Sequence, residues 1–215
     1  MHLTRLALAG VMPILLASAA NAQFVDDFAD GTNMGWNGDG PMVIMGGGAD
    51  GAADPYLQVS ATGGGGPGSK MAMFNDEARW TTDFNNPIFN LSVLFDDPNA
   101  SINTLELRAV IFAGDGSRWT STDAVMIGRS SDWQTASFEI AEPFMSRVAG
   151  SATFDTTIDT MTRVMFRHDA GGPSAGGTTT NAIVGFDNLY TSPLPEPAAL
   201  SLLGIAGLGL LRRRA

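Results

Sequence analysis

The sequence contains no cysteine. Thiol nucleophiles, cysteine-ligated zinc and iron–sulfur clusters are therefore excluded, and a domain of this size can fold without disulfides. It has only two histidines, and His168 is the one outside the N-terminal segment. It stands between Arg167 and Asp169, a setting more typical of the end of a strand than of a catalytic triad. A Gly-x-Ser-x-Gly nucleophile motif is also missing, so the sequence gives catalysis little support.

Basic residues are scarce as well. Residues 23–193 hold eight lysines and arginines against 21 aspartates and glutamates, a formal charge of −13. Binding to nucleic acid or to anionic lipid usually needs basic patches, so this composition argues against both. It is compatible with calcium and with neutral glycans, and solubility alone would explain it equally well.

Helical periodicity is rare between the two ends of the chain, and short β-prone runs separated by Gly, Asp, Asn and Pro dominate. In Thr104–Ala113, apolar residues at 105, 107, 109 and 111 alternate with the others, as in a strand with one buried face. We therefore predict an all-β antiparallel sandwich of the jelly-roll type over residues 23–191, in preference to a barrel or a propeller blade. The other predicted strands are 42–45, 56–60, 70–74, 89–95, 118–127, 133–140, 161–168 and 182–190.

The N-terminal 22 residues have the three parts of a secretory signal peptide. Arg5 lies in a short basic region, residues 6–16 form an apolar region, and Ala20, Asn21 and Ala22 supply small residues at a cleavage site. We expect Gln23 to be the first residue after cleavage. An N-terminal anchor is the weaker alternative, because the apolar run is short.

The C-terminal residues 192–215 form a second signal-like segment. Pro195, Glu196 and Pro197 precede an apolar run at 198–211, and Arg212, Arg213 and Arg214 follow it. As a helix this run would be about 21 Å long, short of the roughly 30 Å hydrocarbon core of a membrane. The prolines favour an extended, protease-accessible chain before it. The alternative is an ordinary single-span anchor.

This order of residues resembles the sorting tail of PEP-CTERM proteins. The resemblance implies recognition by an exosortase in a Gram-negative bacterium that makes exopolysaccharide. It also implies export through the inner membrane, transient insertion of the tail helix, cleavage near Pro195–Pro197, and delivery to the cell surface or extracellular matrix. It covers only the tail and implies nothing about the chemistry of the body.

The body resembles the galactose-binding-like jelly rolls, which include many carbohydrate-binding modules. The segments that carry this resemblance are residues 26–28, 133–138, 163–166 and 186–190. In that family an acidic residue near the first strand and an aspartate in the last strand commonly bind a structural calcium, which points here to Asp27 and Asp187. The alternative is that Asp27 caps a turn and Asp187 faces solvent. Asp50 and Asp54 are typical turn formers.

The tryptophans are the candidates for sugar contacts, because exposed aromatic faces pack against the C–H faces of sugars. Trp80 follows Arg79, and Trp119 follows Arg118, whose guanidinium could bind hydroxyl groups. We therefore predict a glycan-binding site that includes Trp80, Trp119 and Arg118. Packing in the core is the alternative for both tryptophans, and we expect it for Trp133.

These signals together predict an exported, non-catalytic β-sandwich at the cell surface or in the matrix, with exopolysaccharide as its ligand. Two alternatives stay open: a structural or adhesive surface protein without a glycan site, and a secreted glycan-active enzyme.

Overall fold

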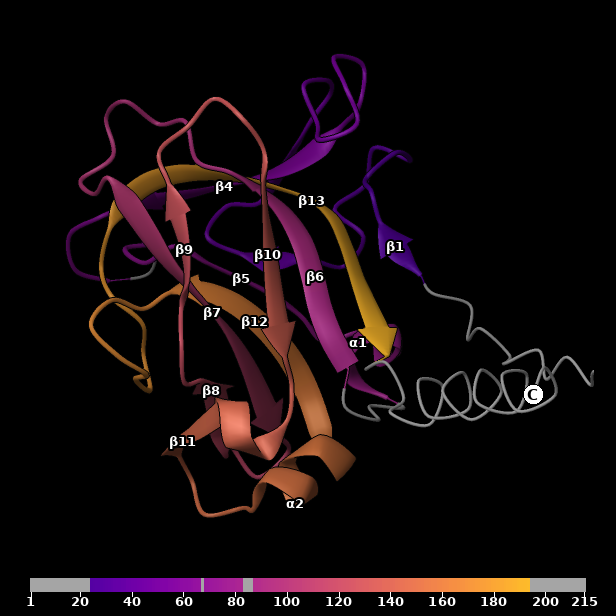
Figure 1. Ribbon diagram of the computed structural model, residues 1–215, viewed down its shortest axis with the longest axis vertical. Coiled ribbons are helices and arrows are strands. Elements are labelled where there is room, and N and C mark those ends of the chain that lie inside the picture. The colour runs from indigo at the N-terminus through magenta and orange to yellow at the C-terminus, as the bar shows by residue number, and fades with distance from the viewer. Residues whose placement is uncertain (1–23, 67, 83–86, 194–215) are drawn as a thin grey trace, which may run out of the picture.

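The computed structural model describes residues 24–66, 68–82 and 87–193, and it confirms the antiparallel β-sandwich (Figure 1). The predicted signal peptide, the PEP-CTERM tail and its apolar helix lie outside these residues. Sheet A has the strand order β10(Gln134–Glu139), β6(Pro87–Leu94), β13(Asn181–Pro193), β4(Tyr56–Thr62), β3(Met42–Ile44), and β1(Val25–Asp26) also pairs with β13. Sheet B has the order β11(Met145–Ala149), β8(Arg118–Ser121), β7(Thr104–Ala113), β12(Met161–His168), β5(Ala72–Asn75), β2(Asn37–Gly38), and β9(Val125–Gly128) also pairs with β7.

The core lies between the two sheets because each strand turns every second side chain inward. In β6 the buried positions include Phe89, Leu91 and Val93. Across the interface, the ring of Phe166 in sheet B lies 5.7 Å from that of Phe89 and 5.8 Å from that of Phe138 in sheet A. Such aromatic contacts join the two layers directly, and they leave the opposite face of each sheet for other roles.

The predicted strand 118–127 is wrong in one respect, because the structure divides it into β8 and β9. Both pair with β7, β8 along Val110–Phe112 and β9 along Thr104–Leu107. One long strand thus supports two short ones end to end on a single edge, with a turn at 122–124 between them. A run of ten β-prone residues does not show such a break.

The short elements were not predicted. These are β1, β2, β11, the helices α1(Ala78–Thr81) and α2(Phe154–Asp159), and the 3-10 turn Glu142–Phe144. Most elements of two to six residues are too short for a hydrophobic period to be read from sequence, although the short strands β3 and β5 overlap the predicted strands 42–45 and 70–74. In α2 the local signal is the N-cap, where the Thr153 hydroxyl accepts a hydrogen bond from the Thr156 backbone N–H. Within the described part of the chain, no helix has the length and apolar character needed to cross a membrane.

The first and last strands lie side by side. Val25 and Asp26 of β1 pair with Tyr190 and Leu189 of β13 in sheet A (Figure 1). The described body therefore begins and ends on the same sheet.

Candidate functional site

The outer face of sheet B carries a row of cationic and aromatic side chains. Phe112 of β7 stands opposite Arg118 of β8 on one side and opposite Arg163 of β12 on the other. Residues directly opposite one another in a sheet point to the same face, so these three side chains form a line across the strands. The neighbouring residues Ile111, Trp119 and Val164 point inward instead and are buried.

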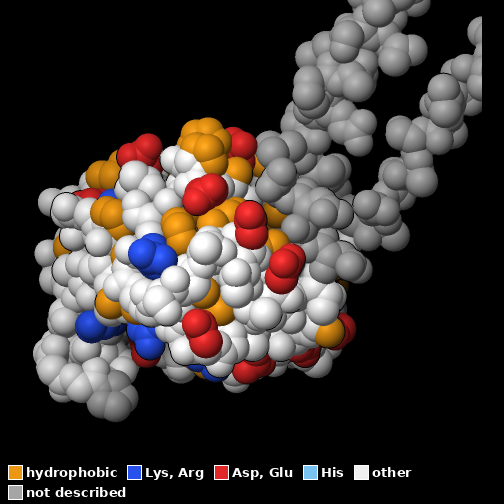
Figure 2. All heavy atoms as spheres, turned by 90° about the horizontal axis from the view of Figure 1, so that it is seen from below, with side chains coloured by type: hydrophobic (Ala, Val, Ile, Leu, Met, Phe, Trp, Pro, Cys, Tyr) orange, Lys and Arg blue, Asp and Glu red, His pale blue; other side chains and the backbone are white. Residues whose placement is uncertain are grey.

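This row lines a hollow with a volume of about 250 Å³, which we call the groove. Its lining includes Lys70, Phe112, Arg118, Arg163, Met165 and Arg167. The groove thus gathers four of the eight basic residues of an otherwise acidic body. Figure 2, which shows one face of the molecule, has acidic side chains scattered over it and the basic ones toward one side.

The arginines stack on aromatic rings. The guanidinium carbon of Arg118 lies 5.0 Å from the centre of the Phe112 ring, and that of Arg163 lies 5.8 Å from the same ring. Arg163 is also 4.1 Å from the centre of the Phe74 ring. These cation–π contacts hold long, flexible side chains in place, so the groove presents its charges in a fixed arrangement.

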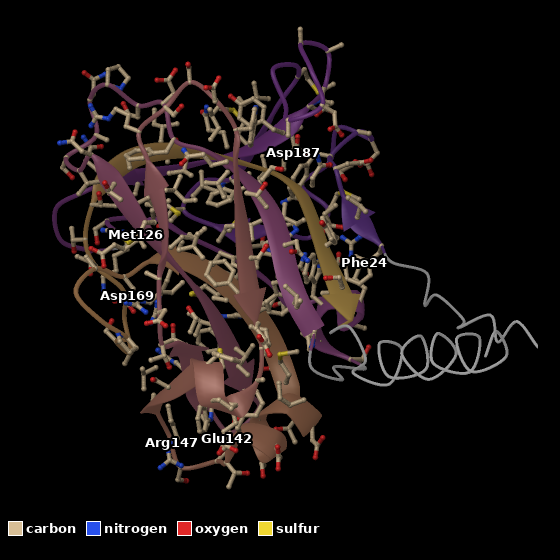
Figure 3. All side chains as sticks on the ribbon, viewed as in Figure 1. Phe24, Met126, Glu142, Arg147, Asp169 and Asp187 are labelled. Atoms are coloured by element: carbon tan, nitrogen blue, oxygen red, sulfur yellow. The ribbon has the colours of Figure 1, made fainter. Side chains whose placement is uncertain are left out.

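One wall of the groove is the rim loop, residues 169–177. Asp169 ties the loop to the sheet: its carboxylate forms an ion pair with Arg167 at 3.0 Å and accepts hydrogen bonds from the Ser174 backbone N–H and hydroxyl. From the groove, Lys70 donates to the Gly176 carbonyl at 2.8 Å and Arg118 to the Ala175 carbonyl at 2.9 Å. In Figure 3, Asp169 lies at the start of this loop, directly after β12.

The groove arginines have hydrogen-bonding capacity to spare. The Nε atoms of Arg118, Arg163 and Arg167 are shielded from solvent and have no hydrogen-bond partner among the residues that the structure describes. Arg167 is only 3% exposed, and burial lowers its pKa, as do the positive charges of Arg118 and Arg108, although Asp169 opposes the shift. Buried donors without acceptors are unfavourable, and a negative charge bound in the groove would offset the charges of these arginines.

His168 and Arg108, next to the groove, have structural roles. The Nδ1 atom of buried His168 accepts a hydrogen bond from the Glu106 backbone N–H at 3.1 Å, and burial lowers the pKa of this imidazole. Arg108 donates to three backbone carbonyls, those of Asp169, Ser121 and Thr122. Within the described residues, these hydrogen bonds of both side chains are to backbone groups.

Of the three residues predicted to bind glycan, only Arg118 lines the groove. Trp80 is 0% exposed, and its indole N–H donates to the Asp26 carboxylate at 2.9 Å inside the core. Trp119 is 8% exposed and packs edge-on against Phe154 at 5.5 Å. Neither ring offers a face to a sugar, so the prediction of stacking platforms at Trp80 and Trp119 is wrong. An arginine next to a tryptophan in sequence does not indicate whether the tryptophan ring faces solvent or the core.

Trp133, expected in the core, lies instead on the outer face of sheet A. Its ring contacts that of Tyr56 at 5.4 Å, and its indole N–H donates to the Gly47 carbonyl at 3.1 Å. Both rings cover Gly185, where an added Cβ would lie 3.0 Å from Tyr56 and 3.1 Å from Trp133. Glycine in the middle of β13 thus makes room for two aromatic rings.

A second hollow, of about 350 Å³, also lies on this outer face, and its lining includes Asn90, Ser92, Thr135 and Tyr190. The polar side chains of this region bond to one another: the Asn90 amide donates to the Ser192 hydroxyl at 2.9 Å and accepts from the Ser137 hydroxyl at 2.8 Å. Asn90 is therefore engaged within the protein, whereas the groove gathers four cationic side chains whose hydrogen bonds are incomplete among the described residues. The smaller, charged groove is therefore the better candidate site.

The two aspartates predicted to bind calcium have different surroundings. The Asp27 carboxylate accepts a hydrogen bond from the Ala29 backbone N–H at 3.1 Å, within its own turn. Asp187, labelled in Figure 3, is fully buried on β13 and accepts from the Ala49 and Asn188 backbone N–H groups at 2.8 and 2.7 Å. The carboxyl group placed against Asp187 is that of Asp54.

The Asp54–Asp187 pair has an unusual protonation equilibrium. The pKa of Asp187 is raised to about 7, mainly by burial and also by the hydrogen bond and charge of Asp54, against the lowering effect of the two backbone N–H groups. The loop that carries Asp54 passes close by, since a Cβ on Gly48 would lie 2.4 Å from the Asp54 carboxylate and 2.8 Å from that of Asp187. In the described ranges, no cluster of three or more His, Cys, Asp or Glu side chains is arranged to hold a metal ion. Calcium binding stays a prediction.

Comparisons with known proteins identify the fold. No family model matches the chain, and no curated protein matches it by sequence. Among solved structures, the CBM22-1–CBM22-2 tandem domain of Xyn10C from Paenibacillus barcinonensis superposes with a TM-score of 0.52 at 13% identity, covering 85% of this chain and 52% of that one. The CBM22-2 xylan-binding domain of the same protein gives 0.50 at 10% identity, covering 80% of this chain and 99% of that domain. An exo-β-agarase gives 0.51 at 10% identity, covering 81% of this chain and 25% of the enzyme.

The body thus has the β-sandwich fold of carbohydrate-binding modules. It matches almost the whole of a single such module, but only about half of the tandem and a quarter of the agarase. At 10–13% identity these likenesses concern the fold, and the chemistry has to be argued from the groove.

Proposed function

We propose that this protein is an exported, non-catalytic carbohydrate-binding protein that holds an exopolysaccharide in the groove on sheet B. The observation that carries the proposal is the gathering of four cationic side chains beside the Phe112 ring in a hollow of about 250 Å³, namely Lys70, Arg118, Arg163 and Arg167. Sugar sites combine such hydrogen-bonding groups with aromatic surface. The neighbours with the same fold include a xylan-binding domain, which supports a glycan ligand.

The alternative of a glycan-active enzyme has less support. A glycosidase needs two carboxyl groups about 5 Å or more apart on either side of the scissile bond. Asp54 and Asp187 instead form a hydrogen bond to each other, and Asp187 is 0% exposed. Next to the groove, Asp169 is 1% exposed and is engaged with Arg167 and Ser174. The structural or adhesive alternative predicts no retention on any polysaccharide.

Filling the groove with an uncharged side chain tests where the ligand binds. Ala175 lies on the exposed rim loop and lines the groove, so Ala175→Trp should block it while leaving the backbone carbonyl in place. We expect the full chain to be retained by at least one polysaccharide of a charged and neutral panel in affinity electrophoresis. We also expect Ala175→Trp to lose most of that retention.

The matched control is Ala29→Trp, which adds the same ring at an exposed turn after β1. It should be retained like the unchanged protein. Equal retention of both variants would place the ligand elsewhere, and failure of the unchanged chain on every polysaccharide, including the native matrix, would refute glycan binding.

Export and sorting form the second part of the proposal, and they rest on residues 1–22 and 192–215 of the sequence. We expect replacement of Pro195, Glu196 and Pro197 by alanine to keep the protein in the inner membrane with its tail uncleaved. Cell fractionation of a host with and without an exosortase gene measures this, with Arg129→Ala as a control in the body. Unchanged release without the exosortase, or with the altered tail, would contradict the sorting route.

A further inference from the structure

We infer that the groove recognises the anionic groups of an acidic polysaccharide, carboxylates or sulfates, and this rests on the groove being the proposed polysaccharide site. Neutral sugars can be bound by hydroxyl groups and amides alone. The side chains that line the groove include no hydroxyl or amide group among the described residues. Their polar groups are three guanidinium groups and one ammonium group.

The charge balance inside the groove is positive. Two of its four basic residues have acidic partners. Arg167 is paired with Asp169 at 3.0 Å. Arg163 has a longer contact of 3.7 Å with Asp76, which is half exposed. Within the described residues, Lys70 and Arg118 form no ion pair, and each donates instead to a carbonyl of the rim loop. At least two positive charges therefore lie in a hollow without a protein counter-ion.

The geometry suits a planar or tetrahedral anion. A guanidinium presents its N–H groups as a rigid fork that matches the oxygens of a carboxylate or a sulfate. Arg167 is only 3% exposed. The Nε atoms of Arg118, Arg163 and Arg167 are buried and have no hydrogen-bond partner in the part of the chain that is described. These shielded Nε atoms are out of a ligand's reach, so an anion in the groove would bind to the other N–H groups of Arg118 and to the Lys70 ammonium group, and it would offset the mutual repulsion of the arginines.

The negative charge on the rest of the body makes the binding of an anionic polysaccharide selective for the groove. The body carries a formal charge of −13, so a polyanion is repelled by the acidic surface and attracted where four basic residues gather at the groove. Retention of an acidic polysaccharide could not then be explained by bulk charge.

Paired probes test the inference on the full chain. Polygalacturonate is compared with its methyl ester, and dextran sulfate with dextran, so that each pair shares a backbone and differs in charge. We expect the charged member of at least one pair to bind about tenfold more tightly or better than its neutral partner, the effect of one or two charge-assisted hydrogen bonds. Arg118→Gln and Lys70→Gln should each weaken binding of that charged probe by about tenfold.

Arg147→Gln is the matched control, because Arg147 is an exposed arginine on β11 outside the groove and the change in charge is the same. It should leave binding unchanged. Equal affinity for both members of each pair would overturn the inference while leaving glycan binding intact. A charge preference that persists in both groove variants would overturn it too, and absence of binding to all four probes together with the native matrix would instead refute the proposed function.

Discussion

Asp26→Ala is expected to lower the free energy of unfolding by about 3–5 kcal/mol, the cost of leaving buried charged and polar partners without their acceptor. The Asp26 carboxylate is fully buried. It accepts hydrogen bonds from the indole N–H groups of Trp36 at 2.8 Å and Trp80 at 2.9 Å, and it pairs with Arg79 at 2.8 Å. Two indoles that contact each other at 5.1 Å are therefore held by one carboxylate.

Asp27→Ala is the matched control, one residue along the chain. Asp27 loses one hydrogen bond, with the Ala29 backbone N–H, in an exposed turn, and we expect a change of about 1 kcal/mol or less. Urea denaturation of both variants at neutral pH gives the comparison. Similar losses for the two variants would show that Asp26 does not have the structural role assigned to it.

The Asp54–Asp187 pair should make the protein less stable as the pH rises from about 4 to about 7. The pKa of Asp187 is raised from its ordinary value of 3.8 to about 7, mainly by burial. In this window the folded protein keeps a proton that the unfolded chain has released, so the free energy of unfolding falls with rising pH and levels off above about 7. The contribution of this one group has an upper limit of about 4 kcal/mol.

Asp54→Asn should reduce that loss, because the amide removes the like charge and can donate to the Asp187 carboxylate. We expect a gain of about 1–2 kcal/mol at pH 8 and a flatter pH profile between 4 and 7, measured by urea denaturation across the series. Asp96→Asn, the same change at an exposed position, is the control. Identical slopes in the two variants would contradict the coupling.

The same pair of proteins, unchanged and Asp54→Asn, tests calcium binding. A bound calcium would require the carboxylates to be ionised, so the melting temperature at pH 8 should rise with calcium and fall with EDTA, and less so in Asp54→Asn. An unchanged midpoint would remove Asp187 as a calcium ligand.

The layers of the fold were predictable because alternation is a local property. Strands β7 and β12 have the predicted bounds, and the buried face of β7 is the one that its alternation indicates. The site was less predictable because it depends on register. Arg118, Phe112 and Arg163 come from three strands, and only their pairing across sheet B brings them into one row.

Other structural roles were missed for the same reason. The roles of Asp26 and Asp54 follow from contacts with Trp36 and Asp187, which are 10 and more than 100 positions away in sequence. The clustering of basic residues at 163 and 167 of one strand was the available signal for the groove, because positions four apart in a strand share a face. The strongly negative net charge of the body gave no indication of this local cluster of basic residues.

The pairing of β1 with the end of β13 has a consequence for how the molecule would be tethered. Because the body begins and ends on sheet A, a linker joined at either terminus pulls on the layer opposite the groove. Force along such a linker loads β1 and β13 first, and the strands that carry Arg118, Phe112 and Arg163 lie in the other sheet. In a protein held through either of these strands, the sheet that takes the load would not be the one that carries the cationic row.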